Sequence, residues 1–239
     1  MRQDKRGPGD LRPIKITSKY IKHQPASVLI EAGDTKIICC AVVDEKAPPF
    51  LRGTGTGWIT AEYSLLPFST GRRSVRESVR GRIGGRTHEI QRLIGRSLRA
   101  AVDLSALGER TIMVDCDVIQ ADGGTRTTAI TGAFVALIHC LRGMKREGMI
   151  KYVPAEDFVA AVSAGVVEGK PLLDLTYEED SGASVDLNIV MTGKGQFVEI
   201  QGTGEEATFS EEEFLKLISL SKEGIPRIIK IQKEIIGEL

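Results

Sequence analysis

The 239-residue sequence lacks several features that would assign it to a class at once. It contains no uninterrupted apolar run of 18 residues, so no membrane-spanning helix is expected. Its first residues lack the apolar core of a secretory signal, so we expect a cytoplasmic protein without membrane contacts. The four cysteines show no Cys-x-x-Cys spacing, and Cys39 and Cys40 are adjacent. We therefore expect buried, reduced thiols rather than disulfides.

The common motifs of nucleotide and hydrolytic chemistry are also missing. There is no P-loop pattern, and the glycine-rich stretch GTGTGW at 53–58 has neither Rossmann spacing nor a helix after it. Only three histidines are present, none paired at the spacing of a zinc-binding helix, and no Gly-x-Ser-x-Gly sequence occurs. A functional site must therefore be sought in other patterns.

Charge is balanced overall but unevenly distributed. Thirty-two basic residues offset 32 acidic ones, so the net charge indicates no particular partner. Between residues 72 and 99, however, nine arginines accompany only two acidic residues. Because the planar guanidinium group suits phosphate recognition, this block predicts a surface for RNA or another polyphosphate. The alternative is a solvated helix face, which fits Arg92, Arg96 and Arg99.

Hydrophobic periodicity predicts two successive sets of strands and helices. Strands are expected at 27–43 (a hairpin around Gly33-Asp34), 58–68, 110–120, 158–168, 171–177, 184–191 and 196–202. Helices are expected from residue 86 to 102, over 130–141, and as segments after Ser210, which forms a capping box with Glu213. The polar, glycine-broken stretch 69–85 predicts no stable element. The pattern suggests one α+β domain over 1–239, with pseudo-duplicated halves of roughly 1–150 and 151–239.

The stretch ADGGTRTT at 121–128 places a flexible turn at the start of the second predicted helix. Gly123 and Gly124 let the backbone approach a ligand closely, and the amides of a helix start carry partial positive charge. Thr125 offers a hydroxyl or a helix cap, and Arg126 offers a forked donor for phosphate. An anion-binding turn and a capped turn with a solvated arginine are both open interpretations of this stretch.

The stretch YEEDSGASVDLNIVM places Asp180 just before a turn and Asp186 at the start of an alternating strand. Val185, Leu187 and Ile189 are expected on one face of that strand. Asp186 is expected on the other face. Two carboxylates a short loop apart can share a hard cation such as Mg²⁺, although aspartate pairs around turns are also common without one.

Five separated blocks, in order, resemble the RNase PH family of phosphate-dependent 3′ exoribonucleases. They are MRQDKRGPGDLRPIKI, GTGTGWITAEYSLLP, GRTHEIQRLIGRSLRA, DCDVIQADGGTRTTAITGA and LDLTYEEDSGASVDLNIV. The resemblance runs through nearly the whole chain and shows no departure from the family's pattern in these blocks. Agreement over five ordered blocks is more specific than any single motif.

The resemblance implies a duplicated βαβα unit with a left-handed βαβ crossover, with mixed sheets flanked by helices, whereas spacing alone favours the common right-handed crossover. It implies a homohexamer, a trimer of dimers, that uses inorganic phosphate to trim the 3′ end of tRNA precursors and releases nucleoside diphosphates. The implied roles are phosphate binding at Arg86, Gly124, Thr125 and Arg126, catalysis with Mg²⁺ at Asp180 and Asp186, and tRNA binding at Arg72, Arg73, Arg76 and Arg80.

Two other functions remain open. The first is a catalytically inactive RNA-binding ring subunit of an exosome-like assembly. Such subunits characteristically lack part of the phosphate or metal set, whereas every residue of that set is present here. The second is a hydrolytic nuclease, which would release nucleoside monophosphates. It also remains open which aspartate, if either, protonates the leaving 3′ oxygen.

Overall fold

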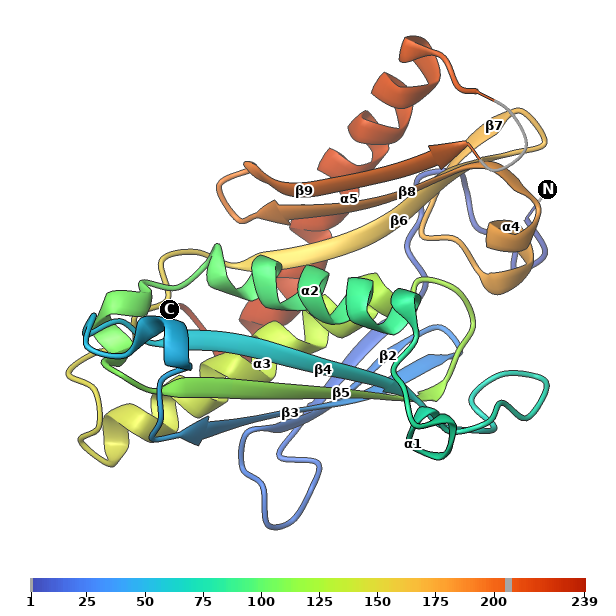
Figure 1. Cartoon of the computed structure of the whole chain (residues 1–239). Helices are drawn as coiled ribbons and strands as arrows, with labels where there is room; N and C mark the ends of the chain where they lie inside the picture. The colour runs from blue at the N-terminus through green and yellow to red at the C-terminus, as the bar shows by residue number, and fades with distance from the viewer. Residues whose placement is uncertain (1, 205–207) are drawn as a thin grey trace.

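The computed structural model describes residues 2–204 and 208–239, and these form two sheets with helices between and around them (Figure 1). The first sheet has the order β1-β2-β3-β5-β4 and consists of β1 Ile14–Ser18, β2 Ser27–Ala32, β3 Thr35–Asp44, β5 Thr111–Gln120 and β4 Trp58–Leu65. The second sheet has the order β7-β6-β8-β9 and consists of β7 Lys170–Leu173, β6 Val159–Val167, β8 Ala183–Thr192 and β9 Phe197–Gly204. All strand pairs are antiparallel except β4 and β5, which are parallel.

The predicted hairpin at 27–43 is confirmed as β2 and β3. Ala32 pairs with Thr35, so the turn consists of Gly33 and Asp34. Gly33 has φ +56°, a conformation that glycine adopts at little cost. A Cβ atom there would also lie 2.7 Å from Cδ of Arg12, so packing as well as backbone conformation requires glycine.

The helix predicted from residue 86 is α2, Gly85–Arg99, which connects the parallel strands β4 and β5. Its apolar face is buried against β4 and α3, as its periodicity predicts. This β4–α2–β5 connection is the βαβ crossover, and its hand stays a prediction. One short 3₁₀ helix, Pro49–Leu51, precedes β4, and another, Leu104–Leu107, lies between α2 and β5.

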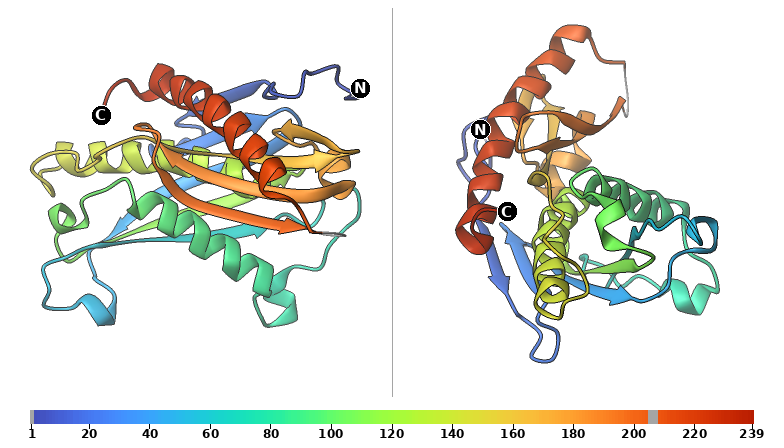
Figure 2. Two further views of the ribbon diagram at one scale, coloured as in Figure 1. Left: turned by 90° about the horizontal axis from the view of Figure 1, so that it is seen from above. Right: turned by 90° about the vertical axis from the view of Figure 1, so that its left-hand side faces the viewer.

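The second predicted helix, α3 (Thr125–Arg146), lies in the middle of the molecule and packs against β2 and β3 of the first sheet and β6 of the second (Figure 2). By length and composition alone α3 is a candidate for crossing a membrane. However, 83% of its apolar window is buried inside the protein, as in the core helix of a soluble protein. Most of the core is one continuous cluster that includes both sheets, and a smaller cluster consists of Leu172, Leu175 and Ala183.

The second half differs from its predicted elements at two places. β7 ends at Leu173, and residue 177 begins a short helix, α4 (Tyr177–Ser181), because Thr176 and Glu179 form a capping box there. After Ser210, whose predicted capping box is confirmed, one helix α5 (Glu211–Ile236) replaces the expected segments. It continues through Pro226 because its buried face packs against β6 and β7, and this packing outweighs the missing amide.

The arginine-rich stretch contains one element that was not predicted, the single helical turn α1 (Glu77–Arg80). Glu77 stabilises this segment, because its Oε1 accepts hydrogen bonds from the amide of Gly84 at 3.1 Å and from Oγ1 of Thr87 at 2.8 Å. The turn ends at Gly81, which has φ +68°. A single carboxylate therefore organises a stretch whose composition favours a loop.

All four cysteines are free thiols, as predicted. Cys39, Cys116 and Cys140 are buried, but Cys40 is only half-buried, on the open face of the first sheet. Burial raises the pKa of Cys40 and of Cys140 to about 11, so both stay protonated at neutral pH.

Candidate active site

The turn at the start of α3 is built from two glycines in the left-handed conformation. Gly123 has φ +71° and Gly124 has φ +60°. A Cβ atom on Gly123 would lie 2.5 Å from the carbonyl oxygen of Leu175, so this glycine lets the turn contact the segment before α4. Thr125 does not cap the helix, because the N-cap position is Gly124, and Thr125 Oγ1 accepts a hydrogen bond from Tyr63 Oη at 2.9 Å. Burial raises the pKa of Tyr63, so this phenol stays a donor at neutral pH.

Two of the predicted phosphate-binding residues face a common cavity of about 710 Å³. Arg126 comes from the first turn of α3 and Arg86 from the first turn of α2. Arg126 is only 15% exposed and is held loosely, with Nη1 at 3.4 Å from Oε1 of Gln201 and 3.6 Å from Oε1 of Glu89. Arg86 is exposed and lines the same cavity. The cavity therefore combines two guanidinium groups with the carboxylate of Glu89, which also lines it.

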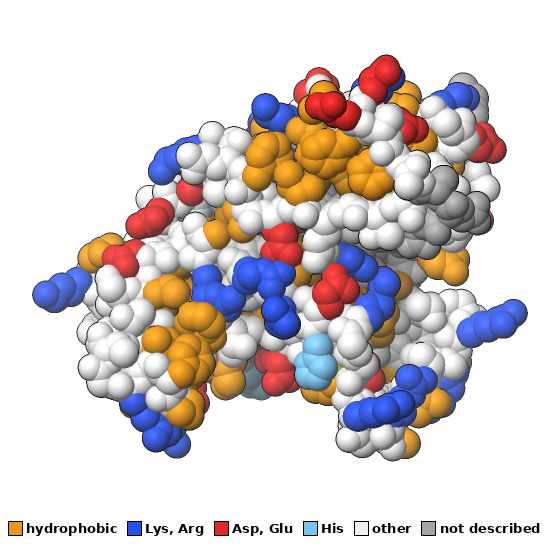
Figure 3. All heavy atoms as spheres, turned by 45° about the horizontal axis from the view of Figure 1, so that its top comes forward, with side chains coloured by type: hydrophobic (Ala, Val, Ile, Leu, Met, Phe, Trp, Pro, Cys, Tyr) orange, Lys and Arg blue, Asp and Glu red, His pale blue; other side chains and the backbone are white. Residues whose placement is uncertain are grey.

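The two aspartates line the same cavity. Asp180 lies in α4 and Asp186 in β8, so both come from the second half of the chain. Val185, Leu187 and Ile189 are buried in the core as predicted, but the alternation of burial along β8 ends at Leu187, because Asn188 and Val190 are buried as well. The face of the molecule that carries α2 shows basic and acidic side chains close together (Figure 3). The fold thus brings together arginines of the first half and aspartates of the second.

The cavity could hold a divalent cation only in an open site. Within the part of the chain that the structure describes, no group of three or more His, Cys, Asp or Glu side chains could bind a metal ion. Asn188 and Gln201 also line the cavity, and Asn188 Nδ2 donates to Asp186 Oδ2 at 3.2 Å. Mg²⁺ is typically bound by one or two carboxylates together with water and substrate phosphates. Asp180 and Asp186 fit that donor set, and they would not form a closed cage.

Gly124 and Thr125 do not line the cavity but lie directly before Arg126 in the chain. The hydroxyl of Thr125 accepts the hydrogen bond from Tyr63. The positive charges of Arg86 and Arg126 act on that phenol and tend to lower its pKa. The helix start and both arginines therefore belong to one electropositive region.

The predicted RNA-binding arginines lie outside this cavity. Arg72, Arg73, Arg76 and Arg80 are all exposed, in the segment that joins β4 to α2. Arg73 and Arg76 border a shallow apolar hollow together with Phe68, whose side chain is 74% exposed. The segment extends from the body of the protein beside α1 (Figure 1).

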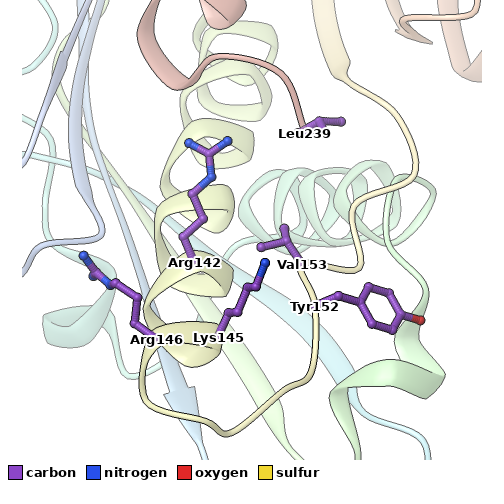
Figure 4. A pocket seen from close by; sticks show the side chains of 6 residues that line it. All are labelled: Arg142, Lys145, Arg146, Tyr152, Val153 and Leu239. Atoms are coloured by element: carbon purple, nitrogen blue, oxygen red, sulfur yellow. The ribbon is translucent and has the colours of Figure 1, made fainter.

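Another hollow, of about 760 Å³, lies at the opposite end of α3 (Figure 4). It is lined by Arg142, Lys145, Arg146, Tyr152, Val153 and Leu239. No aspartate or glutamate is among these residues. Arg142 serves the fold there, because it donates to the carbonyl oxygens of Ile236 at 2.6 Å and Glu238 at 2.9 Å. Of these two cavities, only the one lined by Arg86 and Arg126 combines arginines with carboxylates.

Sequence reasoning missed several residues that build the site. Tyr63, Asn188 and Gln201 were not singled out, because each looks like an ordinary strand residue in a linear pattern. Arg12 and Asp174 were missed for another reason: their ion pair joins positions 162 residues apart. Arg12 lies within the first block of the family resemblance, which is the one signal in the sequence that includes it.

The class of protein follows from comparison with known families. Residues 10–142 match domain 1 of the 3′ exoribonuclease family, and residues 157–224 match domain 2. The chain belongs to this 3′ exoribonuclease (RNase PH) family, so the predicted family is confirmed.

Full-length relatives agree with this assignment. The chain is 59% identical over 239 residues to a protein named Ribonuclease PH from Listeria welshimeri, covering 100% of this chain and 96% of the relative. It is 56% identical over 240 residues to Ribonuclease PH from Bacillus mycoides, covering 100% of this chain and 98% of the relative. These relatives confirm the predicted class of enzyme, an exoribonuclease.

Solved structures confirm the fold. A chain of the Archaeoglobus fulgidus exosome with RNA bound to the active site is 23% identical, with a TM-score of 0.82 over 96% of this chain and 91% of that one. Rice (Oryza sativa) Rrp46 is 20% identical, with a TM-score of 0.79 over 98% of this chain and all of the other. At these identities the likeness establishes the RNase PH-like arrangement of two sheets flanked by helices.

Proposed function

We propose that the chain is a phosphorolytic 3′ exoribonuclease in which inorganic phosphate attacks the terminal phosphodiester of an RNA. The bond from phosphorus to the 3′ oxygen of the preceding nucleotide breaks, and a bond to an oxygen of the attacking phosphate forms. The terminal nucleotide leaves as a nucleoside diphosphate, and the 3′ oxygen takes up a proton. The observation that carries the proposal is the cavity lined by Arg86 and Arg126 together with Asp180 and Asp186.

The main physical task of this reaction is to bring two anions together. Phosphate is ionised at neutral pH, so it needs no strong base to act as a nucleophile. The free phosphate and the phosphodiester repel each other, and the site must compensate that charge while holding them in line. Arg86, Arg126 and the positive end of the α3 dipole supply such compensation in a partly enclosed cavity.

Asp180 and Asp186 would act at the leaving 3′ oxygen. A Mg²⁺ ion bound by both carboxylates would stabilise the negative charge that develops on that oxygen. One of the aspartates could instead deliver the proton that the oxygen takes up. The carboxylate and amide oxygens that line this wall of the cavity support either role.

We further propose that the exposed arginines at 72, 73, 76 and 80 bind the backbone of tRNA precursors, with six copies of the chain forming a ring as a trimer of dimers in the cytoplasm. All four residues are exposed to solvent. Exposed arginines are suited to bind phosphate groups of RNA. The likeness to exosome subunits supports a ring-like assembly.

The test is to incubate the protein with a tRNA that carries extra 3′ nucleotides, with and without inorganic phosphate. Release of nucleoside diphosphates that depends on phosphate is the expected result. Nucleoside monophosphates without phosphate dependence would indicate a hydrolase. A chain that binds tRNA but releases nothing would be an RNA-binding ring subunit, which the full set of site residues makes the weaker alternative.

A further inference from the structure

Arg12 and Asp174 form a buried ion pair that has no assigned part in the chemistry. Nη2 of Arg12 donates to Asp174 Oδ1 at 2.8 Å, and Nε donates to Oδ2 at 3.2 Å. The backbone amide of Arg12 also donates to Oδ2, at 2.7 Å. The two side chains are only 3% and 8% exposed. The forked geometry and the burial fix both groups in one arrangement.

This pair lies between the two turns that carry the candidate site. On one side, Nη1 of Arg12 donates to the carbonyl oxygen of Asp122, and both terminal nitrogens lie 3.5 Å from the carbonyl oxygen of Gly123. These carbonyls belong to the turn that begins α3 and precedes Arg126. On the other side, Asp174 begins the short segment that leads into α4 and Asp180. We call these segments the phosphate turn (residues 122–125) and the carboxylate turn (residues 174–181).

The two turns are also in direct contact. The amide of Tyr177 in the carboxylate turn donates to Oδ1 of Asp122 in the phosphate turn at 3.1 Å. Gly123 fits against the same backbone, where a Cβ atom would lie 2.5 Å from the carbonyl oxygen of Leu175 and 2.8 Å from the amide nitrogen of Tyr177. A Cβ atom on Gly124 would lie 2.9 Å from Nη2 of Arg12. The relative position of the turns therefore depends on a small number of close contacts with Arg12 at their centre.

We propose that Arg12 is a positioning residue that sets the spacing between the phosphate turn and the carboxylate turn. Its side chain does not line the cavity. It holds the start of α3, and with it Arg126, at a fixed place relative to Asp180. This inference rests on the proposed function, because the spacing decides whether the attacking phosphate and the leaving oxygen can lie in line. Misplacement of reacting groups by about 1 Å can reduce a rate by roughly a hundredfold.

The test is the substitution Arg12→Lys, with Arg142→Lys as the matched control. Lysine keeps the positive charge, but its single ammonium cannot reproduce the fork that reaches the carboxylate of Asp174 and the carbonyl of Asp122 together. Arg142 likewise donates to two backbone carbonyls, but at the far end of α3 (Figure 4). Three quantities are measured on each folded protein: the Kd for inorganic phosphate by calorimetry, the KM for phosphate in phosphorolysis, and the Kd for tRNA.

For Arg12→Lys we expect the Kd and the KM for phosphate to rise about tenfold or more, with the Kd for tRNA unchanged within about twofold. Arg142→Lys is expected to change none of the three. If Arg12→Lys folds and keeps the wild-type Kd and KM for phosphate, the pair serves stability alone and the proposal is wrong. Equal loss of tRNA affinity would also overturn it.

A second substitution, Asp174→Asn, covers the case in which Arg12→Lys does not fold. It keeps the size of the side chain but removes the charge that accepts the fork of Arg12, so the same rise in the Kd and KM for phosphate is expected, and an unchanged Kd would refute the proposal. If the wild-type protein releases no nucleoside diphosphate, the proposed function is wrong, and this result leaves the positioning role of Arg12 to be decided separately. The positioning role is then decided by calorimetry with phosphate: it stands if the variants bind phosphate more weakly and falls if they do not.

Discussion

Replacement of Arg126 by alanine should abolish most of the phosphorolysis while leaving RNA binding largely intact. The side chain is 15% exposed and lines the cavity, so its charge acts on phosphate in a partly dehydrated site. Its contacts with Glu89 and Gln201, at 3.6 and 3.4 Å, are long, so it is available to a ligand at little cost. Removing one preorganised donor of this kind typically reduces kcat by about 10²–10³-fold, or roughly 2.7–4 kcal/mol. We expect a loss of that size in kcat/KM.

Folding should survive this substitution, because the partner Glu89 is 46% exposed and does not become a buried, unpaired charge. The assay measures release of nucleoside diphosphates over a range of phosphate concentrations, and tRNA affinity separately by filter binding. Arg146→Ala is the matched control, since Arg146 is an exposed arginine in the last turn of the same helix. If Arg126→Ala weakens tRNA binding as much as it reduces phosphorolysis, the assignment of Arg126 to phosphate is wrong.

Three further predictions concern other parts of the molecule. Arg72→Ala with Arg73→Ala should weaken tRNA affinity and reduce its dependence on salt, by a log–log slope of about 1 for each lost phosphate contact, without loss of turnover at saturating tRNA. Asp180→Asn and Asp186→Asn should each remove activity while the oligomer, measured by size-exclusion chromatography, stays intact. Burial and neighbouring positive side chains lower the pKa of His139 in the folded protein below its ordinary value of 6.5. At a pH between the lowered pKa and 6.5, the unfolded chain therefore binds more protons than the folded one. The free energy of unfolding should therefore fall as the pH drops below about 6.5, and His139→Gln should reduce that loss in urea unfolding at pH 7.0 and 5.5.

Each of these predictions has an outcome that contradicts it. Loss of chemistry at unchanged tRNA affinity would place Arg72 and Arg73 in the reaction rather than in RNA binding. Turnover that survives either asparagine substitution would contradict a role of the aspartates at the leaving oxygen. An equal drop in the urea midpoint for wild type and His139→Gln would mean that other groups cause the acid sensitivity.

Patterns of neighbouring residues in the sequence were sufficient to predict most of the helices and strands. The hairpin at Gly33-Asp34 and the capping box at Ser210 depend on residues next to one another, and both are confirmed. The strand predicted at 171–177 was too long, because the capping box of Thr176 with Glu179 begins a helix inside it. That signal was present in the sequence and was missed. The continuous helix through Pro226, by contrast, depends on tertiary packing, which a local pattern does not contain.

The family resemblance predicted each residue of the candidate site. Without it, the residue types in the stretches around Arg126 and Asp180 left more than one interpretation open. The structure brings Arg86 and Arg126 to the cavity that Asp180 and Asp186 also line, which no linear pattern could establish. The support beneath the site is also non-local. Arg12 reaches a carbonyl 110 positions away, and an arginine near the start of a chain gives no local sign of such a role.

The most direct test of the central claim is to follow the attacking phosphate itself. Radioactively labelled inorganic phosphate is supplied with an unlabelled tRNA that carries extra 3′ nucleotides, and the products are separated. If the cavity between the two halves binds phosphate as the nucleophile, the label appears as the β-phosphate of the released nucleoside diphosphates. If the label stays in inorganic phosphate while nucleoside monophosphates are released, water is the nucleophile and the phosphorolytic mechanism is wrong.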